Sequence, residues 1–469
     1  MKHLTRLLVV LALAGVCAIP AASAADRMWM GFHDDPVFRW DDNRMSELDK
    51  AQAAHATIIR TLVTWANAAP TKPANPANPF DPAYKLDDVD ELVRNAQNRG
   101  MEVLITLWGT PKWANGGKTP NYLPTNMNDM RQFAQAIAAR YSGRYAGYPF
   151  VRFYGIWNES NLGQFLSPQF GPGGKIIAPA AYAKLAAAAY TGIKAGNPQA
   201  LVGVGETSSH GRDKPLAGAS DAVSPGTFAR LVAQANPKLR FDAWAQHPYP
   251  YPVFMKPAQL LKWPNVSLES FPRFETSLNS WFHRKSIPIW ITEYGHETKP
   301  GEPLGVTEAQ QAAYLTQAVA LAKSYPYVPM FIWFVFRDST GSTWQSGLSR
   351  LNGTPKPALA RWTAITPALD ARNPHLLVKG GSPAPAVNLD VREICGNNAP
   401  GTPIGVTYRA RLNGKLIKVG QQQVALGTDC SITVRPVFVV TKAKSFQVTF
   451  DMNTANGVLV TRVATITGT

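Results

Sequence analysis

Eight short apolar or β-branched runs alternate with longer segments of helical periodicity, and this alternation constrains the fold more than any other feature of the sequence. Strands that alternate with helices predict a parallel sheet, and eight of them favour closure of that sheet into a (β/α)8 TIM barrel. We therefore expect an α/β fold whose strands occupy residues 28–32, 57–62, 102–107, 152–157, 201–204, 241–246, 288–292 and 330–335.

The segments between these runs carry helix signals. Residues 86–99, 128–141 and 180–195 are predicted to be helices, and the first and third of them stop at a glycine. Thr307 followed three residues later by Gln310 forms a capping box, which predicts another helix start.

Long polar inserts rich in glycine, proline and aromatic residues follow the predicted strands, at residues 67–84, 109–126, 161–179, 206–226, 248–272, 294–306 and 337–356. In a barrel all of them would lie at the carboxyl ends of the strands, the face that carries the sites of barrel enzymes. The inserts are therefore suited to form the walls of a groove.

The first 24 residues have the pattern of a bacterial secretory signal. Lys2 and Arg6 precede an apolar stretch at residues 7–19, and Ala22-Ser23-Ala24 supplies a small-residue cleavage site. A lipoprotein signal ending at Cys17 is the alternative, although Val16 fits poorly before a lipidated cysteine. We expect a secreted or periplasmic protein without a membrane span, because no other apolar run is long enough to cross a bilayer.

The composition changes after Trp362. A Gly-Gly-Ser-Pro-Ala-Pro stretch at residues 380–385 resembles a linker or an edge, and short alternating runs follow at 406–412, 432–434 and 445–452. This pattern predicts a barrel over residues 25–372 and a small β-sandwich-like module over residues 373–469. Once the signal is removed, Cys395 and Cys430 are the two remaining cysteines, and in an oxidising compartment they are expected to form a disulfide.

The formal net charge of +16 would favour acidic partners such as a uronate-containing polysaccharide. An ordinary basic exported protein is the simpler interpretation, because the basic residues are scattered along the chain. No nucleic-acid-binding motif is present, so we expect no nucleic-acid partner.

Two of the predicted strands deliver a glutamate at or just beyond their carboxyl ends, Glu159 after Trp157-Asn158 and Glu293 after Thr292. Taken singly, each has a simpler explanation, a helix cap for the first and a surface carboxylate for the second. Strands 4 and 7 lie nearly across the mouth of a barrel, so the two side chains can face each other. Hydrolysis of a glycosidic bond requires such a pair, with one acid to protonate the leaving oxygen and one carboxylate opposite.

The sequences Trp157-Asn158-Glu159-Ser160-Asn161 and Ile291-Thr292-Glu293-Tyr294-Gly295 resemble those of the clan A glycoside hydrolases. The preceding Ala139-Arg140-Tyr141 and the Ile156-Trp157 spacing most resemble family 39 and its relatives, with family 5 next. The resemblance covers residues 28–362 and implies a retaining mechanism, with Glu159 as the general acid/base and Glu293 as the nucleophile. It also implies that Asn158 hydrogen-bonds the sugar 2-hydroxyl. Ser160 departs from the proline usual in the clan, which affects the turn and not the chemistry.

Four further positions resemble clan residues. Arg60 would lie near the nucleophile and keep it ionised, and Tyr249 could donate to Glu293. His247 would contact substrate or hold the acid/base, and Trp333 would form a floor for the sugar. The alternatives are a surface arginine, a structural histidine and a core tryptophan.

Other residues near the predicted strand ends are candidates for sugar binding. Trp108 and Trp113 are two of a series of aromatic residues there, and the others are Trp65, Tyr122, Tyr251, Trp263 and Trp344. Individually each could equally pack within a loop, but together they favour a carbohydrate groove. Glu206 would either contact a sugar hydroxyl or pair with Arg212.

No metal or other cofactor is expected. The cluster His33-Asp34-Asp35 has no second group at metal-ligand spacing, and we expect it to form hydrogen bonds within the barrel mouth or to a distal sugar. The sequence thus predicts an exported retaining glycosidase that acts on a polysaccharide or oligosaccharide, with an endo-acting enzyme favoured by the long loops. A transglycosylase and a non-catalytic carbohydrate-binding protein remain as alternatives.

Overall fold

The computed structural model describes residues 27–340, 344–395, 398–428, 430–453 and 459–469. The predicted signal at residues 1–24 lies outside these ranges. Within them, no helix is both long and apolar enough to cross a membrane.

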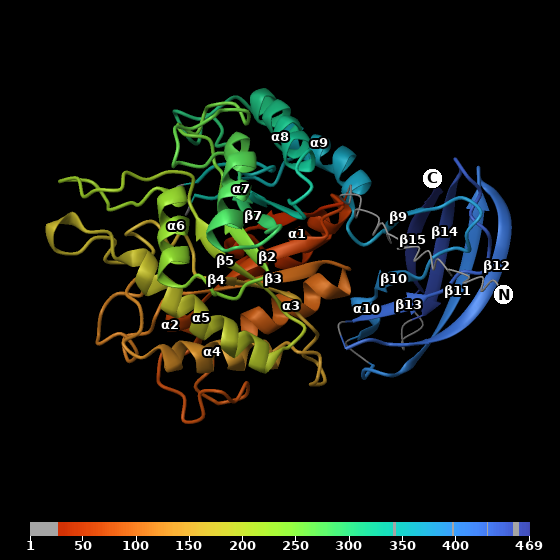
Figure 1. Ribbon diagram of the computed structural model, residues 1–469, viewed down its shortest axis with the longest axis horizontal. Coiled ribbons are helices and arrows are strands. Elements are labelled where there is room, and N and C mark those ends of the chain that lie inside the picture. Colours follow the sequence, from red (N-terminus) through yellow and green to blue (C-terminus); the bar gives the residue numbers. More distant parts are fainter. Residues whose placement is uncertain (1–26, 341–343, 396–397, 429, 454–458) are drawn as a thin grey trace, which may run out of the picture.

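Eight parallel strands close into a barrel in sequence order, as predicted (Figure 1). The first and last strands pair directly, with Gly31 opposite Ile332, and this contact completes the ring. The strands are β1 (Trp29–His33), β2 (Ile58–Thr64), β3 (Glu102–Trp108), β4 (Phe153–Ile156), β5 (Leu201–Thr207), β6 (Ala243–Gln246), β7 (Ile289–Tyr294) and β8 (Met330–Phe334).

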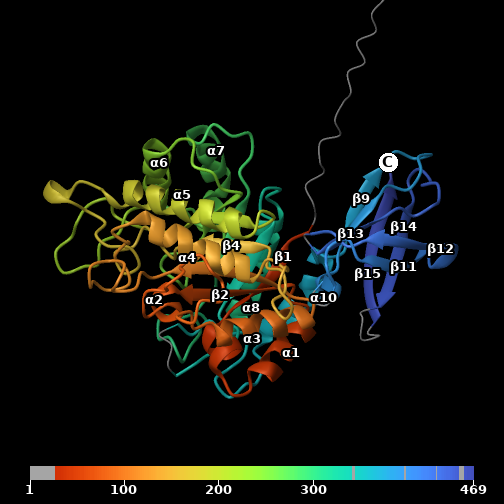
Figure 2. The ribbon, with the colours of Figure 1, turned by 90° about the horizontal axis from the view of Figure 1, so that it is seen from below.

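Helices surround the barrel and connect its strands (Figures 1 and 2). The predicted capping box is present, since the Thr307 hydroxyl accepts from the backbone N–H of Gln310, whose side chain accepts from that of Thr307. The helices between and after the strands are α1 (Arg44–Ala53), α2 (Trp65–Ala68), α3 (Asp87–Asn98), α4 (Met127–Arg140), α5 (Ala178–Gly196), α6 (Pro225–Ala235), α7 (Phe271–Trp281), α8 (Glu308–Lys323) and α9 (Pro357–Ile365). Short helical turns lie at η1 (Pro36–Trp40), η2 (Pro172–Gly174), η3 (Leu268–Ser270) and η4 (Thr366–Leu369).

Apolar side chains fill the amino-terminal part of the barrel interior and leave its carboxyl-terminal mouth to polar groups. Ile58, Leu104, Phe153, Trp290 and Ile332 belong to this inner cluster, and each is buried. Because this packed layer closes the lower part of the barrel, the polar side chains further along the strands are held at the mouth.

The C-terminal module contains two sheets, a five-stranded sheet in the order β12-β11-β14-β15-β9 and a two-stranded sheet of β10 and β13. The pairing is antiparallel except between β15 and β9, which run parallel. The elements are β9 (His375–Val378), β10 (Val387–Asp390), α10 (Arg392–Cys395), β11 (Pro403–Leu412), β12 (Lys415–Ala425), β13 (Ser431–Val434), β14 (Ser445–Asn453) and β15 (Leu459–Gly468). Cys395 and Cys430 form the expected disulfide, with their Cα atoms 5.4 Å apart.

The structure decides between the two interpretations of residues 380–385, which were a linker and an edge. The stretch at residues 380–385 does not join the barrel to the module, because β9 precedes it and already belongs to the five-stranded sheet. Instead the stretch packs within the module, where the backbone N–H groups of Gly380 and Gly381 donate to Thr469 and Val440.

The module lies beside the amino-terminal end of the barrel, opposite the mouth (Figures 1 and 2). Arg392 of α10 pairs with Glu102, the first residue of β3, and its guanidinium lies 5.6 Å from the ring centre of Trp29, the first residue of β1. Phe150, which precedes β4, is buried in the apolar core of the module. The two parts therefore share buried contacts and not merely a connecting segment.

Candidate active site

Irregular backbone at three strand ends aims carboxylates into the barrel mouth. Glu159 follows β4 with φ of 36°, and Glu206 in β5 has φ of 46°. The pairing of β5 with β6 shifts register between Gly205 and Thr207, and that of β7 with β8 shifts between Ile291 and Tyr294, the interval that contains Glu293. Such bulges commonly redirect a side chain beside an active site, because the extra residue breaks the alternation of the strand.

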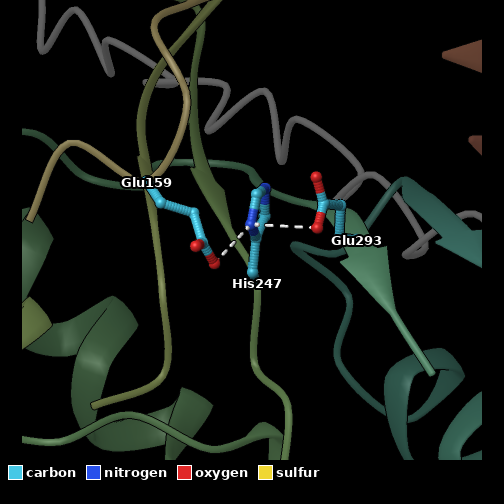
Figure 3. A group of neighbouring side chains, drawn as sticks. All are labelled: Glu159, His247 and Glu293. Atoms are coloured by element: carbon cyan, nitrogen blue, oxygen red, sulfur yellow. Dashed lines mark hydrogen bonds and ion pairs between the residues drawn. The ribbon is translucent and has the colours of Figure 1, made fainter. Parts of the chain in front are cut away.

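His247 lies between Glu159 and Glu293 (Figure 3). Its Nδ1 is 3.2 Å from Oε1 of Glu159 and 3.5 Å from Oε2 of Glu293. One ring nitrogen of His247 and one carboxylate oxygen from each of Glu159 and Glu293 all lie within 4.8 Å of one another. The structure thus brings the two predicted glutamates together across the mouth, with the imidazole of His247 as their shared neighbour.

Glu293 is held by cationic and neutral donors. Arg60 Nη1 donates to its Oε1 at 2.5 Å, and the Tyr249 hydroxyl donates to its Oε2 at 3.0 Å. Burial alone would raise the pKa of Glu293, but the charges of His247 and Arg60, together with the contact to His33, outweigh burial and hold the pKa well below its usual value. Glu293 is therefore ionised at neutral pH, which is the state that the predicted nucleophile role requires.

Glu159 has the opposite electrostatic character. Burial raises its pKa above the usual value, and the negative charge of Glu293 acts in the same direction, while the contact with His247 only partly offsets them. Two carboxyl groups whose environments push their pKa values apart can divide the roles of proton donor and charged nucleophile between them.

The geometry of Glu159, His247 and Glu293 is compact enough to be compared with a metal site. However, the Arg60 guanidinium already contacts Glu293 and supplies positive charge where a metal would have to sit. A divalent cation there would be repelled by this arginine, which cannot lose its proton. We therefore interpret the trio as a proton-sharing group and not as a set of metal ligands.

Glu206 lies deeper than the sequence suggested. It is fully buried, contacts Arg60 and His247, and does not line the cavity at the mouth. Arg212, the alternative partner, donates instead to the backbone of Ser220. The expected contact of Glu206 with a sugar hydroxyl is therefore replaced by contacts beneath Glu159 and Glu293.

A cavity of about 580 Å³ opens above the pair. Asn158, Glu159, Tyr249 and Glu293 line it, and Asn158 also accepts a hydrogen bond from Arg60 at 2.9 Å. The remaining walls come mainly from the long loops, and they include Phe165, His210, Tyr251, Phe334 and Trp344.

Five of the six tryptophans expected to contact sugar do not line this cavity. Trp333 is fully buried and donates to the carbonyl of Ser346, and the next residue, Phe334, lies at the cavity wall in its place. Trp113 donates to the carbonyl of Ala69 and packs against Trp65.

Trp108, the third, stands behind the wall and packs edge-on against Phe165 and Trp157. Of the other aromatic candidates, Tyr251 and Trp344 reach the cavity, whereas Trp65 stacks on Phe133 of α4 and Trp263 packs against Trp281 of α7.

Two cavity residues gave a weak sequence signal. His33 lines the cavity and lies 2.7 Å from Arg60, in agreement with the hydrogen bonds expected for this residue at the barrel mouth. His210 stacks on Tyr251 with ring centres 3.9 Å apart, which no local pattern indicates because the two residues belong to different loops.

Solved structures with the same fold include several glycoside hydrolases. A family 39 glycoside hydrolase from Bacteroides cellulosilyticus WH2 has a TM-score of 0.54 and 18% identity, and the alignment covers 88% of this chain and 82% of that one. GH5_18 from Streptomyces cattleya, in complex with GlcNAc, has a TM-score of 0.51 and 16% identity, with 76% and 85% covered. An exo-beta-1,4-mannosidase from an Opitutaceae bacterium, strain TAV5, has a TM-score of 0.50 and 16% identity, with 76% and 64% covered.

No curated protein sequence matches this chain. At the identities found, the structural neighbours show the fold alone, so the preference for family 39 is not confirmed. The sequence itself matches the model of the cellulase family, glycosyl hydrolase family 5, over residues 25–336, which include the barrel strands and both glutamates. The chain therefore belongs to glycosyl hydrolase family 5 and is a clan A glycoside hydrolase.

Proposed function

We propose that this protein is an exported, retaining glycosidase that cleaves internal bonds of a polysaccharide by double displacement. The observation that carries the proposal is the short separation of the carboxyl groups of Glu159 and Glu293, whose nearest atoms lie within 4.8 Å. Retaining enzymes hold their two carboxyl groups about 5–5.5 Å apart, whereas inverting enzymes leave about 6.5–9.5 Å for a water molecule.

In the first step, a carboxylate oxygen of Glu293 forms a bond to the anomeric carbon. The bond from that carbon to the leaving oxygen breaks, and the proton of Glu159 passes to the leaving oxygen. In the second step, Glu159 takes a proton from water while the water oxygen bonds to the anomeric carbon and Glu293 departs as a carboxylate. Arg60 and Tyr249, which contact Glu293, stabilise this departing charge.

Cleavage of a glycan panel, with the product anomer followed by NMR, tests the proposal directly. A first-formed product with the same anomeric configuration as the substrate is expected. An inverted product would overturn the retaining mechanism, and binding without cleavage of any glycan would favour a carbohydrate-binding protein. Transfer of the glycosyl group to added sugar acceptors in preference to water would identify a transglycosylase.

A Glu159→Ala variant tests the acid/base role. Cleavage of glycosides with poor leaving groups should fall by about 10²- to 10⁴-fold, the usual contribution of a general acid. Glycosides of 2,4-dinitrophenol need no protonation of the leaving group, so their first step should lose little. Azide should then accelerate turnover of the variant and yield a glycosyl azide of retained configuration, but should not accelerate the unmodified enzyme. Equal loss on both substrate types would remove Glu159 from this role.

A second groove supports action on an extended chain. It has a volume of about 350 Å³, lies between η1 and the α2–α3 region, and shares Leu62 with the catalytic cavity. Trp40 is 59% exposed at its edge, and Lys85 lines the same groove. A glycan that occupies the catalytic cavity could continue past Leu62 and place an apolar sugar face on the Trp40 indole.

A Trp40→Ala variant should lower kcat/KM for the longest accepted oligosaccharide by about 3- to 10-fold, the equivalent of one stacking contact. The same variant should cleave the shortest accepted substrate at the unmodified rate. Tyr145 is a matched control, because it is an exposed aromatic residue in the loop before β4, at the opposite end of the barrel. Identical losses on short and long substrates, or an equal effect of Tyr145→Ala, would contradict a distal sugar site.

Export is supported by the signal-like pattern at residues 1–24 and by the Cys395–Cys430 disulfide, which suits an oxidising compartment. Mass spectrometry of the mature N-terminus should find cleavage after Ala24.

A further inference from the structure

Glu206 has contacts that neither substrate binding nor the double-displacement steps account for. It lies in β5, is fully buried, and accepts hydrogen bonds with both carboxylate oxygens. Oε1 accepts from the Thr106 hydroxyl at 3.3 Å, and Oε2 accepts from Thr292 at 2.6 Å and from Arg60 at 3.3 Å. Nε2 of His247 lies 3.1 Å from the same Oε2. Groups from four other strand regions therefore converge on this carboxylate.

The local backbone is adapted to place Glu206 inside the barrel. Its φ of 46° is unfavourable for a residue with a Cβ, and it occupies the bulge that shifts the β5–β6 register. On β4, a Cβ at Gly155 would collide with Oε1 of Glu206 and would lie 2.6 Å from the Thr106 hydroxyl oxygen. Strain at one strand and a required glycine on the next indicate that the position of this carboxylate is specific.

His247 meets a carboxylate at each ring nitrogen. Nε2 faces Glu206. Nδ1 faces Glu159 at 3.2 Å and Glu293 at 3.5 Å (Figure 3). A neutral imidazole carries one N–H only, so one nitrogen lone pair would point at a carboxylate oxygen. With a proton on both nitrogens, each contact becomes a charge-assisted hydrogen bond.

The charges of the cluster balance only when Glu206 is counted. In the resting state of a retaining glycosidase Glu159 is protonated and Glu293 is ionised. Arg60 and His247 would then carry two positive charges against the single negative charge of Glu293, and Glu206 supplies the second. His33 also contacts Arg60 and Glu293, but it is paired with Asp35, and Arg39 beside it is paired with both Asp35 and Asp88.

We propose that Glu206 is a positioning residue that keeps His247 protonated on both ring nitrogens and oriented between Glu159 and Glu293. This inference rests on the proposed retaining function, since it explains how Glu159 and Glu293 are kept in the protonation states that this function requires. Burial would lower the pKa of His247, but the charge of Glu293 and the hydrogen bonds with Glu159 and Glu206 raise it to about 9. Burial would raise the pKa of Glu206, and Arg60 and His247 more than offset this effect.

The first test uses the unmodified protein labelled with ¹⁵N at histidine. The His247 ring, assigned by its loss in a His247→Gln variant, should show two protonated nitrogens at pH 7 and should titrate above pH 8. A neutral His247 at pH 7 would overturn the proposal. Because this measurement needs no substrate, it can succeed even if no glycan is cleaved, which separates failure of the proposed function from failure of this inference.

The second test is Glu206→Gln, which removes the charge and keeps the shape of the side chain. His247 should lose a proton at pH 7, so the negative charges of Glu293 and Glu159 lose a cationic neighbour and their pKa values rise. Both limbs of the kcat/KM profile should move upward, by about one pH unit or more. At a pH below the acid limb, each unit of this shift lowers kcat/KM about tenfold, because the ionised fraction of Glu293 falls accordingly. KM should change little, since Glu206 does not line the cavity.

Two further variants separate charge from simple structural support. Glu206→Asp keeps the carboxylate and should restore the imidazolium signal and most of the original pH profile. Thr106→Val removes a neutral hydroxyl that donates to Glu206 and accepts from Arg60 Nε, so it takes hydrogen bonds but no charge from the cluster and should leave both pH limbs in place. Unmoved limbs in Glu206→Gln, or equal shifts in Glu206→Gln and Thr106→Val, would show that Glu206 does not act through the charge of His247.

Discussion

Replacing Glu293 by glutamine is expected to lower kcat by about 10⁴-fold or more on any glycan that the unmodified enzyme cleaves, which is the usual scale for loss of a nucleophile. The amide oxygen of glutamine is a poor nucleophile and cannot form the glycosyl ester through which double displacement proceeds. The substitution also leaves Arg60 without its closest anionic contact, at 2.5 Å, so the variant loses charge stabilisation as well.

Glu297 supplies the matched control for this experiment. It lies four residues further along, is buried to a similar degree, and accepts a hydrogen bond from the backbone of Gln345 at 3.0 Å. Glu297→Gln makes the same chemical change without touching the catalytic pair, and its kcat should stay close to that of the unmodified enzyme. Retention of more than a tenth of the activity in Glu293→Gln would remove Glu293 from the nucleophile role.

Covalent trapping gives an independent readout of the same prediction. A 2-deoxy-2-fluoro glycoside with an activated leaving group slows both steps, because the fluorine destabilises the oxocarbenium-like transition state. Peptide mass spectrometry should find the added sugar on Glu293. Label on Glu159 or Glu206 would reassign the roles within the cluster.

The barrel was predictable from the sequence because parallel strands are buried on both faces and appear as short, nearly continuous apolar runs. The ends of these runs also indicated Glu159 and Glu293, since an apolar run that stops at a carboxylate points to the barrel mouth. Arg60 and Tyr249 could be placed next to Glu293 through the resemblance to the clan, and the structure places both in contact with it.

The incorrect prediction for Glu206 concerns a feature that depends on strand register. Alternation along a strand predicts which side chains face inward, but a bulge shifts that pattern by one residue. Glu206 occupies such a bulge in β5, so its burial under the catalytic pair could not be inferred from its place after an apolar run. The exchange of Trp333 and Phe334 has a different cause, because β8 keeps its alternation and pairs with β1 without a register shift. Met330 and Ile332 lie in the inner cluster and Phe334 lines the cavity, so the same alternation turns Trp333 outward, whereas the resemblance to the clan had placed Trp333 under the sugar.

The junction between the module and the barrel was also missed, because its contacts join residues far apart in the chain. Arg392 pairs with Glu102 at 2.6 Å, although about 290 positions separate them. Charged residues at such separations leave no local pattern. The sequence therefore predicted a second module without indicating how it is fixed to the barrel.

That junction gives the largest expected effect on stability. Arg392 contacts both Glu102 and Asp390, and Arg152 contacts the same two carboxylates at 3.3 Å and 2.8 Å. The side chains of Arg392 and Glu102 are each 1% exposed. Two arginines and two buried acids thus meet where the module joins the barrel, and burial raises the pKa of Glu102 to about 8. The Arg392 guanidinium also donates to the backbone carbonyl of Gly100 at 2.9 Å.

Arg392→Met is expected to lower the free energy of unfolding by about 3–5 kcal/mol, the usual cost of leaving a buried charge without its partner. Arg409→Met is the matched control, because Arg409 pairs with Asp451 within the same module but is 38% exposed. An exposed pair of this kind contributes about 0–1 kcal/mol. Urea denaturation of both variants measures the difference, and equal losses would show that the buried pairs do not stabilise the junction.

The same variant also tests what the module does. If the module supports the lower end of the barrel, barrel and module should unfold in one transition in the unmodified protein and in two in Arg392→Met. Adding Glu102→Gln to Arg392→Met removes one of the two carboxylates left with Arg152 alone, and should recover part of the lost stability.

A glycan-binding role of the module predicts instead that Arg392→Met weakens retention on insoluble polysaccharide. Support of the barrel is favoured because, within the described part of the module, the large exposed apolar side chains are aliphatic and include no aromatic ring on which a sugar could stack.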